Sequence, residues 1–135
     1  MEVLHKSKYW HFGCSKEQHL MWYEWFDTSI DMTDEEYKEE MSANAAQCTI
    51  QKLPLALVDL RKFKFMITPE VQTWTDQIIF PQFIASGLKR IAFVVSSDLF
   101  AQVSLQQMMD EKIAKEQFAS KYFETKEDAT QWLQS

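Results

Sequence analysis

The fold is decided by a short apolar stretch at residues 55–60, Leu-Ala-Leu-Val-Asp-Leu. Apolar side chains occupy both odd and even positions, so both faces of a strand made from this stretch are buried, as an interior parallel strand requires. Residues 91–95, Ile-Ala-Phe-Val-Val, repeat the pattern. Strands of this kind that alternate with helical stretches indicate an α/β protein with a mostly parallel sheet.

Two aromatic-rich stretches precede these strands, at residues 8–14 and 19–27. The polar residues 15–18 separate them, which predicts a β-hairpin with a four-residue turn. Trp10, Trp22 and Trp25 lie on this hairpin. Because side chains alternate along a strand, Trp22 and Trp25 are expected on opposite faces, one of them packed beneath the first helix.

The first helix is expected to begin after Thr33. The Thr33 hydroxyl can accept from a backbone N–H three residues on while the Glu36 carboxylate reaches back, which is a capping box. The acidic residues 34–40 are therefore interpreted as a solvated helix start and not as a metal site. Apolar residues then recur at helical spacing over about three to four turns, namely Tyr37, Met41, Ala45 and Cys48.

A second helix is expected to begin at Thr68 and Pro69, because threonine is a favourable N-cap and proline is tolerated at the first helical position. Pro81 is expected to kink or end its regular part, since the ring clashes with the carbonyl four residues back. Gly87 is placed to stop the helix. Its predicted inward-facing residues are Val71, Trp74 and Ile78.

A third helix is expected to open at Asp98, a short strand to follow around residues 120–123, and a last helix to begin after Thr125. The predicted order is thus β-β-α-β-α-β-α-β-α in a single domain over residues 1–135, with a five-stranded sheet and an antiparallel hairpin at its edge. The inward-facing candidates are Leu99 or Phe100, Val103, Met108 and Ile113 in the third helix and Ala129, Trp132 and Leu133 in the last.

The handedness of the connections predicts where the helices lie. Strand–helix–strand crossovers are right-handed in about 98% of cases. If each new strand adds to the same edge of the sheet, every helix falls on one face. Parallel sheets normally have both faces covered, so the other face is expected to need a lid, a ligand or a second subunit.

Composition excludes several classes of protein. The apolar fraction of 46% is that of a globular chain and excludes intrinsic disorder. The formal net charge is −6, and the densest basic run, residues 61–64, is too short to bind a phosphate backbone. Nucleic-acid binding is therefore not expected.

The chain is expected to act in the cytoplasm. Residues 1–6 lack the apolar core of a signal peptide, and no uncharged apolar run is long enough to span a bilayer. Cys14 and Cys48 are too few and too far apart for a disulfide framework or a zinc motif. We expect both to be buried free thiols in a reducing compartment.

No catalytic residue, metal or cofactor is expected. His11 and His19 could approach across the hairpin, but no third ligand stands at metal-binding spacing. Ser96 and Ser97 lack the Gly-x-Ser-x-Gly context of a nucleophile elbow. With two glycines in all, the chain offers no Gly-rich phosphate cradle.

Polar residues at the carboxyl ends of the central strands are the candidates for a binding site, because ligands of open α/β sheets tend to bind beyond these ends. The candidates are Asp59, Arg61, Ser96 and Ser97, which are expected to face the helix that begins at Thr68. One interpretation is a small polar or anionic pocket built from helix N–H groups and Arg61. The other is structural, with Asp59 bonded to loop amides and Arg61 in a surface ion pair.

The order of these pieces resembles the STAS and SpoIIAA-like (anti-sigma-factor-antagonist-like) domains, which include small bacterial proteins of this length. The resemblance rests on residues 23–25, 57–61, 68–74, 87–92 and 122–133. It implies the (βα)n superhelix shared by STAS and CRAL-TRIO lipid-binding domains, and no enzymatic activity. True antagonists carry a phosphorylatable serine in an Asp-Ser-Ser-Gly type motif, where this chain has Met-Ile-Thr-Pro at residues 66–69. Partner switching by phosphorylation is therefore not expected: Thr68 is a candidate substitute acceptor, but as an N-cap it already has a structural role.

Two functions are consistent with these observations. The first is a non-enzymatic regulatory or interaction module that binds a protein partner or forms a homodimer through the uncovered sheet face. Trp10, Trp22 and Trp25 are its interface candidates. The second is a small-molecule or lipid carrier with an apolar ligand, indicated by the implied superhelix and the aromatic hairpin.

Overall fold

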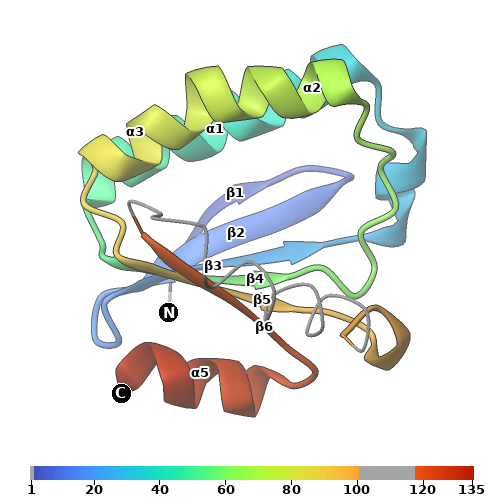
Figure 1. Cartoon of the computed structure of the whole chain (residues 1–135). Helices are drawn as coiled ribbons and strands as arrows, with labels where there is room; N and C mark the ends of the chain where they lie inside the picture. The colour runs from blue at the N-terminus through green and yellow to red at the C-terminus, as the bar shows by residue number, and fades with distance from the viewer. Residues whose placement is uncertain (1, 101–117) are drawn as a thin grey trace.

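The computed structural model describes residues 2–100 and 118–135. Its described strands form one six-stranded sheet in the order β1-β2-β3-β4-β5-β6 (Figure 1). The first three strands pair antiparallel, and β3 to β6 pair parallel. The strands are β1 (Glu2–Lys6), β2 (Trp10–Ser15), β3 (Leu20–Trp25), β4 (Leu55–Asp59), β5 (Arg90–Val94) and β6 (Ala119–Phe123). The predicted α/β class, with its mostly parallel sheet and antiparallel hairpin, is confirmed.

The sheet has one strand more than the sequence predicts, and that strand is β1. Its residues pair with β2 from Glu2 opposite Cys14 to Lys6 opposite His11. No residue of β1 is buried, so the segment lacks the apolar alternation by which the other strands are found. Backbone pairing holds it against β2, where Gly13 has no side chain and a Cβ would lie 1.9 Å from the Glu2 carbonyl oxygen.

The helices that join β3 to β4 and β4 to β5 lie on one face of the sheet, which is called here the α1–α3 face (Figure 1). α1 (Asp34–Gln51) joins β3 to β4. The next connection joins β4 to β5 and consists of α2 (Pro69–Trp74), the π-helical segment η2 (Thr75–Ile79) and α3 (Phe80–Ala85). This arrangement follows from right-handed crossovers between successive neighbouring strands.

The prediction that every helix lies on one face is wrong. α5 (Lys126–Gln134) packs on the opposite face, against β4, β5 and β6. It follows the last strand and is not part of a crossover, so the handedness rule does not constrain it. Ala129 and Leu133 of α5 form a second small core with Ala92 and Val94 of β5. α5 therefore covers the second face of the sheet at β4, β5 and β6. This second face is called here the α5 face.

The predicted helix starts are confirmed. At α1, the Glu36 N–H donates to the Thr33 hydroxyl over 3.1 Å, and the Thr33 N–H donates to the Glu36 carboxylate over 3.0 Å. The helix runs for 18 residues, longer than expected, and buries Tyr37, Ala45 and Cys48. The Thr68 and Thr125 hydroxyls accept from the N–H groups three residues on and cap α2 and α5 in the same way.

One predicted inward position in the second crossover is wrong. Val71 is buried and Trp74 is half-buried, as expected, but Ile78 is 48% exposed. Thr75 and Ile79 take the inward positions instead. The cause is the wider turn of η2, in which a residue bonds five positions back instead of four and shifts the buried stripe by one residue.

Pro81 accounts for this wider turn. A proline nitrogen cannot donate to the carbonyl four residues back, so the α-helical ladder must break near it. The Phe80 N–H donates instead to the Thr75 carbonyl, five residues back. α3 then ends at Gly87, which adopts a φ of 96° that favours glycine.

Helical hydrogen bonding resumes after β5, where the Ser96 carbonyl accepts from the Phe100 N–H over 2.8 Å. The predicted inward residues Val103, Met108 and Ile113 lie outside the described residues. In the described part of the chain, no helix combines the length and apolarity that a membrane crossing requires.

Candidate binding cavity

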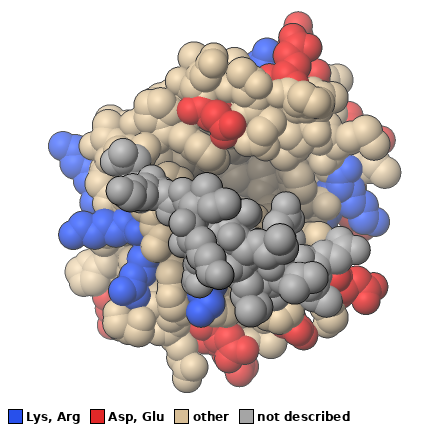
Figure 2. Space-filling model, viewed as in Figure 1, with Lys and Arg blue, Asp and Glu red and all other residues tan. Residues whose placement is uncertain are grey.

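A cavity of about 700 Å³ lies between the sheet and the α1–α3 layer. Small-molecule pockets typically measure roughly 300–1,000 Å³, so this volume is large enough for a ligand. Figure 2 shows the molecule hollowed below α2 and α3, with mostly uncharged atoms along the upper rim of the hollow. The cavity is therefore the first candidate for a functional site.

The floor of the cavity comes from alternate residues of the parallel strands. Because successive side chains point to opposite faces of a strand, every second residue of β3, β4 and β5 faces α1–α3. These floor residues are Met21, Tyr23 and Trp25 in β3, Ala56 and Val58 in β4, and Ile91 and Phe93 in β5.

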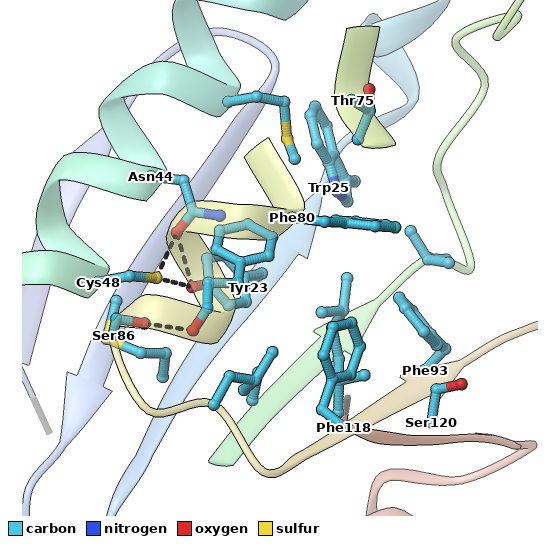
Figure 3. A pocket seen from close by; sticks show the side chains of 18 of the residues that line it. Tyr23, Trp25, Asn44, Cys48, Thr75, Phe80, Ser86, Phe93, Phe118 and Ser120 are labelled. Atoms are coloured by element: carbon cyan, nitrogen blue, oxygen red, sulfur yellow. Dashed lines mark hydrogen bonds between the residues drawn. The ribbon is translucent and has the colours of Figure 1, made fainter. Parts of the chain in front are cut away.

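The roof is apolar and largely aromatic. Tyr37 and Met41 of α1 and Phe83 of α3 line it. Figure 3 shows the rings of Phe80 and Phe118 around the hollow, and their centroids are 5.9 Å apart in an edge-to-face arrangement. Such a lining favours apolar ligands with flat faces.

A buried polar cluster interrupts the apolar wall. The Tyr23 hydroxyl donates to Asn44 Oδ1 over 2.6 Å, and the Cys48 thiol donates to the same oxygen over 3.4 Å (Figure 3). Burial raises the pKa of the Tyr23 hydroxyl well above its usual range and also raises the pKa of the Cys48 thiol. Both groups therefore keep their protons at neutral pH and stay hydrogen-bond donors.

A second hydroxyl pair on the wall is internally satisfied. The Thr75 hydroxyl donates to the Val71 carbonyl over 2.9 Å, and it lies 2.9 Å from the Tyr37 hydroxyl. Since the Thr75 proton is used toward the carbonyl, the Tyr37 hydroxyl is the donor in the second bond. This pair ties α1 to η2 across the roof.

The cavity carries little charge. Among its described lining residues the one charged side chain is Asp76, and none is a lysine, arginine or histidine. Asp76 is exposed and accepts from the Gln72 amide over 2.9 Å. A ligand seated inside therefore meets no cationic group on the described wall.

The sequence-predicted residues Asp59 and Arg61 meet each other on the edge of the α5 face. The Arg61 guanidinium donates to both Asp59 carboxylate oxygens, over 3.0 and 2.8 Å, and the Arg61 N–H donates over 3.1 Å. Lys126, at the start of α5, lies 3.7 Å from the same carboxylate. Burial acts to raise the pKa of Asp59, but the hydrogen bonds and charges of Arg61, with the charge of Lys126, outweigh it and lower that pKa.

The three predicted hydroxyl residues do not join this pair. Thr68 accepts from the Val71 N–H over 3.3 Å as the cap of α2. Ser96 accepts from the Leu99 N–H over 3.4 Å, and the Ser97 hydroxyl donates to Glu124 over 3.3 Å. Each hydroxyl thus serves a local structural bond, and Asp59 and Arg61 are the two candidates that the fold brings together.

The hairpin tryptophans separate between the two faces as the alternation predicts. Trp10 and Trp25 stack with ring centroids 4.1 Å apart and line the cavity, so they lie inside the molecule. Trp22 lies half-buried on the other face, edge-on to His11 at 5.1 Å. The indole N–H groups of Trp10 and Trp22 are buried without a hydrogen-bond partner among the described residues.

Both cysteines are buried free thiols, as predicted. Burial raises the pKa of Cys14, and the Glu2 charge adds to the rise. In the described ranges, no group of three histidine, cysteine or acidic residues stands where it could hold a metal ion.

Comparison with known proteins agrees with the fold. The model of the SpoIIAA-like family matches residues 23–134. This match spans most of the sequence, and the chain therefore belongs to the SpoIIAA-like family, whose members are STAS-type domains. Searches of curated proteins and of solved structures found no match.

Sequence reasoning missed the cavity and its polar cluster. Asn44 lies one helical turn before Cys48, on the stripe that was assigned to the core, and a buried polar residue on such a stripe is an available signal. No sequence pattern indicates the empty volume of the cavity, because that volume depends on the distance between the helices and the sheet. Tertiary packing, and not local pattern, sets that distance.

Proposed function

We propose that this protein is a non-enzymatic STAS-type domain that binds an apolar small molecule in the cavity between α1–α3 and the sheet. The observation that carries the proposal is the cavity of about 700 Å³ with its apolar wall. Family membership supports a regulatory or interaction role in general terms. Ligand binding is one way in which the activity of such a domain can be regulated.

The energetics favour an apolar occupant. Each square ångström of apolar surface removed from water stabilises the complex by roughly 25 cal/mol. Two apolar side chains that line the cavity are also partly exposed, Ile67 at 39% and Ile84 at 38%. Apolar side chains that are both exposed and part of a cavity wall are expected at the entrance of a site for apolar molecules.

The absence of catalysis is part of the proposal and rests on the state of the nucleophiles. A thiol reacts as its thiolate, and the raised pKa values of Cys14 and Cys48 keep both protonated at neutral pH. The unpaired thiols also suit a reducing cytoplasm. Ser96 and Ser97 bond to local groups, as described above, and not to a histidine.

A fluorescence titration tests the proposal. N-phenylnaphthylamine is neutral and apolar, and its emission rises when it leaves water, so we expect saturable binding with one site per chain. Ala56→Leu places a larger side chain on the cavity floor and is expected to abolish that signal. Ala46→Leu makes the same change on the exposed side of α1 and is expected to bind like the wild type. Absence of saturable binding, or equal binding by both variants, contradicts the proposal.

Protein binding is a second candidate, supported by exposed apolar residues beyond the carboxyl ends of β3 and β4. Ile30 is 65% exposed and Met66 is 82% exposed. Their segments are joined where the Lys64 N–H donates to the Ser29 hydroxyl over 2.9 Å. If this surface forms a homodimer, the double variant Ile30→Ser, Met66→Ser is expected to lower the sedimentation coefficient at high protein concentration. A wild type that sediments as a monomer at every concentration excludes the homodimer.

A further inference from the structure

The polar cluster on the cavity wall fixes how the Asn44 side chain is oriented. The Tyr23 hydroxyl and the Cys48 thiol both direct protons at Asn44 Oδ1. Burial keeps both donors protonated, and in the structure the amide oxygen is the atom that faces them. The amide nitrogen is then turned the other way, and Figure 3 shows it pointing away from the Tyr23 and Cys48 bonds.

This orientation leaves the Asn44 amide N–H₂ group unused. Asn44 is only 4% exposed and lines the cavity, yet its nitrogen donates to none of the described residues. Among the described residues, the buried side-chain atoms without a partner are the indole nitrogens of Trp10 and Trp22, so the Asn44 nitrogen is one that the cavity leaves accessible. Several other polar side chains on the wall are engaged, namely Tyr37 with Thr75, Gln72 with Asp76, and Ser86 with the Phe83 carbonyl, whereas the Trp10 indole N–H has no partner among the described residues. The Asn44 nitrogen is therefore available to donate to an acceptor inside the cavity, either a water molecule or a ligand oxygen.

The charge of the wall decides which acceptor fits. A carboxylate or phosphate placed beside Asn44 would lose its water without gaining a cation from the described wall, where no lysine, arginine or histidine lines the cavity. Burial of an unpaired charge is far more costly than burial of a neutral oxygen. An uncharged acceptor such as a carbonyl oxygen gains the hydrogen bond without that cost.

We infer that the cavity binds neutral apolar molecules that carry a carbonyl-type oxygen, such as ketones, quinones or esters, with this oxygen accepting from Asn44 Nδ2. Free fatty acids and other anions are disfavoured. The inference rests on the proposed function, because it names the ligand class of the same cavity.

Three probes of matched shape test the inference. Benzophenone, diphenylmethane and diphenylacetate each carry two phenyl rings on one central carbon. That carbon is a carbonyl in benzophenone, a methylene in diphenylmethane and bears a carboxylate in diphenylacetate. One hydrogen bond is worth about a three- to tenfold gain in affinity, so benzophenone is expected to bind tighter than diphenylmethane by that factor. Diphenylacetate is expected to bind weakest. If none of the three binds, the proposed function fails. If benzophenone and diphenylmethane bind equally, or diphenylacetate binds best, the inference alone fails.

A substitution at Asn44 tests whether this residue causes the preference for a carbonyl-bearing ligand. Asn44→Leu keeps the approximate volume and removes the donor, so benzophenone and diphenylmethane are expected to bind it with equal affinity. Ser42→Leu makes a polar-to-leucine change on the exposed side of the same helix and is expected to retain the wild-type ratio. A carbonyl preference that survives in Asn44→Leu overturns the assignment.

A spectroscopic measurement on the wild type covers the case in which Asn44→Leu does not fold. The side-chain amide resonances of Asn44 are expected to shift when benzophenone is added and to stay in place at matched occupancy of diphenylmethane. Equal shifts with both probes overturn the inference, because the amide would then sense occupancy of the cavity and not the oxygen.

Discussion

The two faces of the sheet are covered by helices in opposite ways. On the α5 face, Ala92 and Val94 of β5 and Ala129 of α5 are all 0% exposed, and helix and strand are in direct contact. On the α1–α3 face, the helical layer encloses a cavity of about 700 Å³. The same sheet thus carries a closed core on one side and a hollow one on the other.

Side-chain size explains the difference. Alanines on both α5 and β5 allow a close approach on the α5 face. On the α1–α3 face, pairs of aromatic rings lie at the border of the layer. The ring centroids of Trp25 and Phe63 are 4.8 Å apart, and those of Tyr37 and Phe65 are 4.9 Å apart. The middle of the floor is Ala56, which leaves the centre empty. Large rings at the border and a small residue at the centre therefore produce the hollow.

The largest effect is expected where the sheet has no room at all. Gly13→Ala would place a Cβ 1.9 Å from the Glu2 carbonyl oxygen and 2.7 Å from the Trp22 ring. Because one of the two obstacles is backbone, the free energy of unfolding is expected to fall by about 3 kcal/mol or more. Urea unfolding measures this loss. A Gly13→Ala protein as stable as the wild type would show that β1 is not paired with β2 as described.

The contrast between the faces is tested directly by one substitution made on each. Ala92→Leu overpacks the closed core and is expected to lower the free energy of unfolding by about 1–3 kcal/mol. Ala56→Leu extends into the hollow and is expected to leave that free energy unchanged or to raise it. Thermal and urea unfolding of both variants supply the comparison. Equal destabilisation would mean that the α1–α3 face is as closely packed as the α5 face.

The smallest effect concerns the ion pair at the edge of the α5 face. The pKa of Asp59 is lowered in the folded protein, so its carboxylate stabilises the fold above the pKa of the unfolded chain, near about 3.9. That contribution is lost as the pH falls through the folded pKa. Asp59→Asn is expected to reduce stability at neutral pH by about 1 kcal/mol, since Arg61 is half-exposed.

The same variant is expected to flatten the acid limb of the stability curve. Unfolding free energies measured between neutral pH and the acid transition show whether the slope changes. An unchanged acid limb in Asp59→Asn would mean that Arg61 and Lys126 do not lower the pKa of Asp59 in the folded protein.

Local pattern predicted most elements of this fold and little of its site. The Thr33 and Thr68 caps and the β4 and β5 strands follow from short-range rules, and the structure confirms them. The position of α5 was missed because no crossover constrains a terminal helix. The exposure of Ile78 was not predicted, because η2 departs from the α-helical period on which the prediction depends.

The candidate site was harder to predict than the fold for a related reason. Asp59, Arg61, Ser96 and Ser97 were selected because open sheets bind ligands beyond their strand ends. In this protein Asp59 and Arg61 bond each other, Ser96 accepts from a backbone N–H, and Ser97 donates to Glu124. The available space lies instead under the helices, where its size depends on which aromatic rings meet across the layer.

The location of a bound probe tests the account most directly. Nuclear Overhauser effects can be recorded between benzophenone and the methyl groups of Val58 and Val94, which lie on neighbouring strands and face opposite sides of the sheet. If the probe binds in the cavity under α1–α3, contacts are expected from the probe to Val58 and Ile91 and none to Val94 or Leu133. Contacts to Val94 and Leu133, or no contact to Val58 and Ile91 at saturating probe, would contradict it.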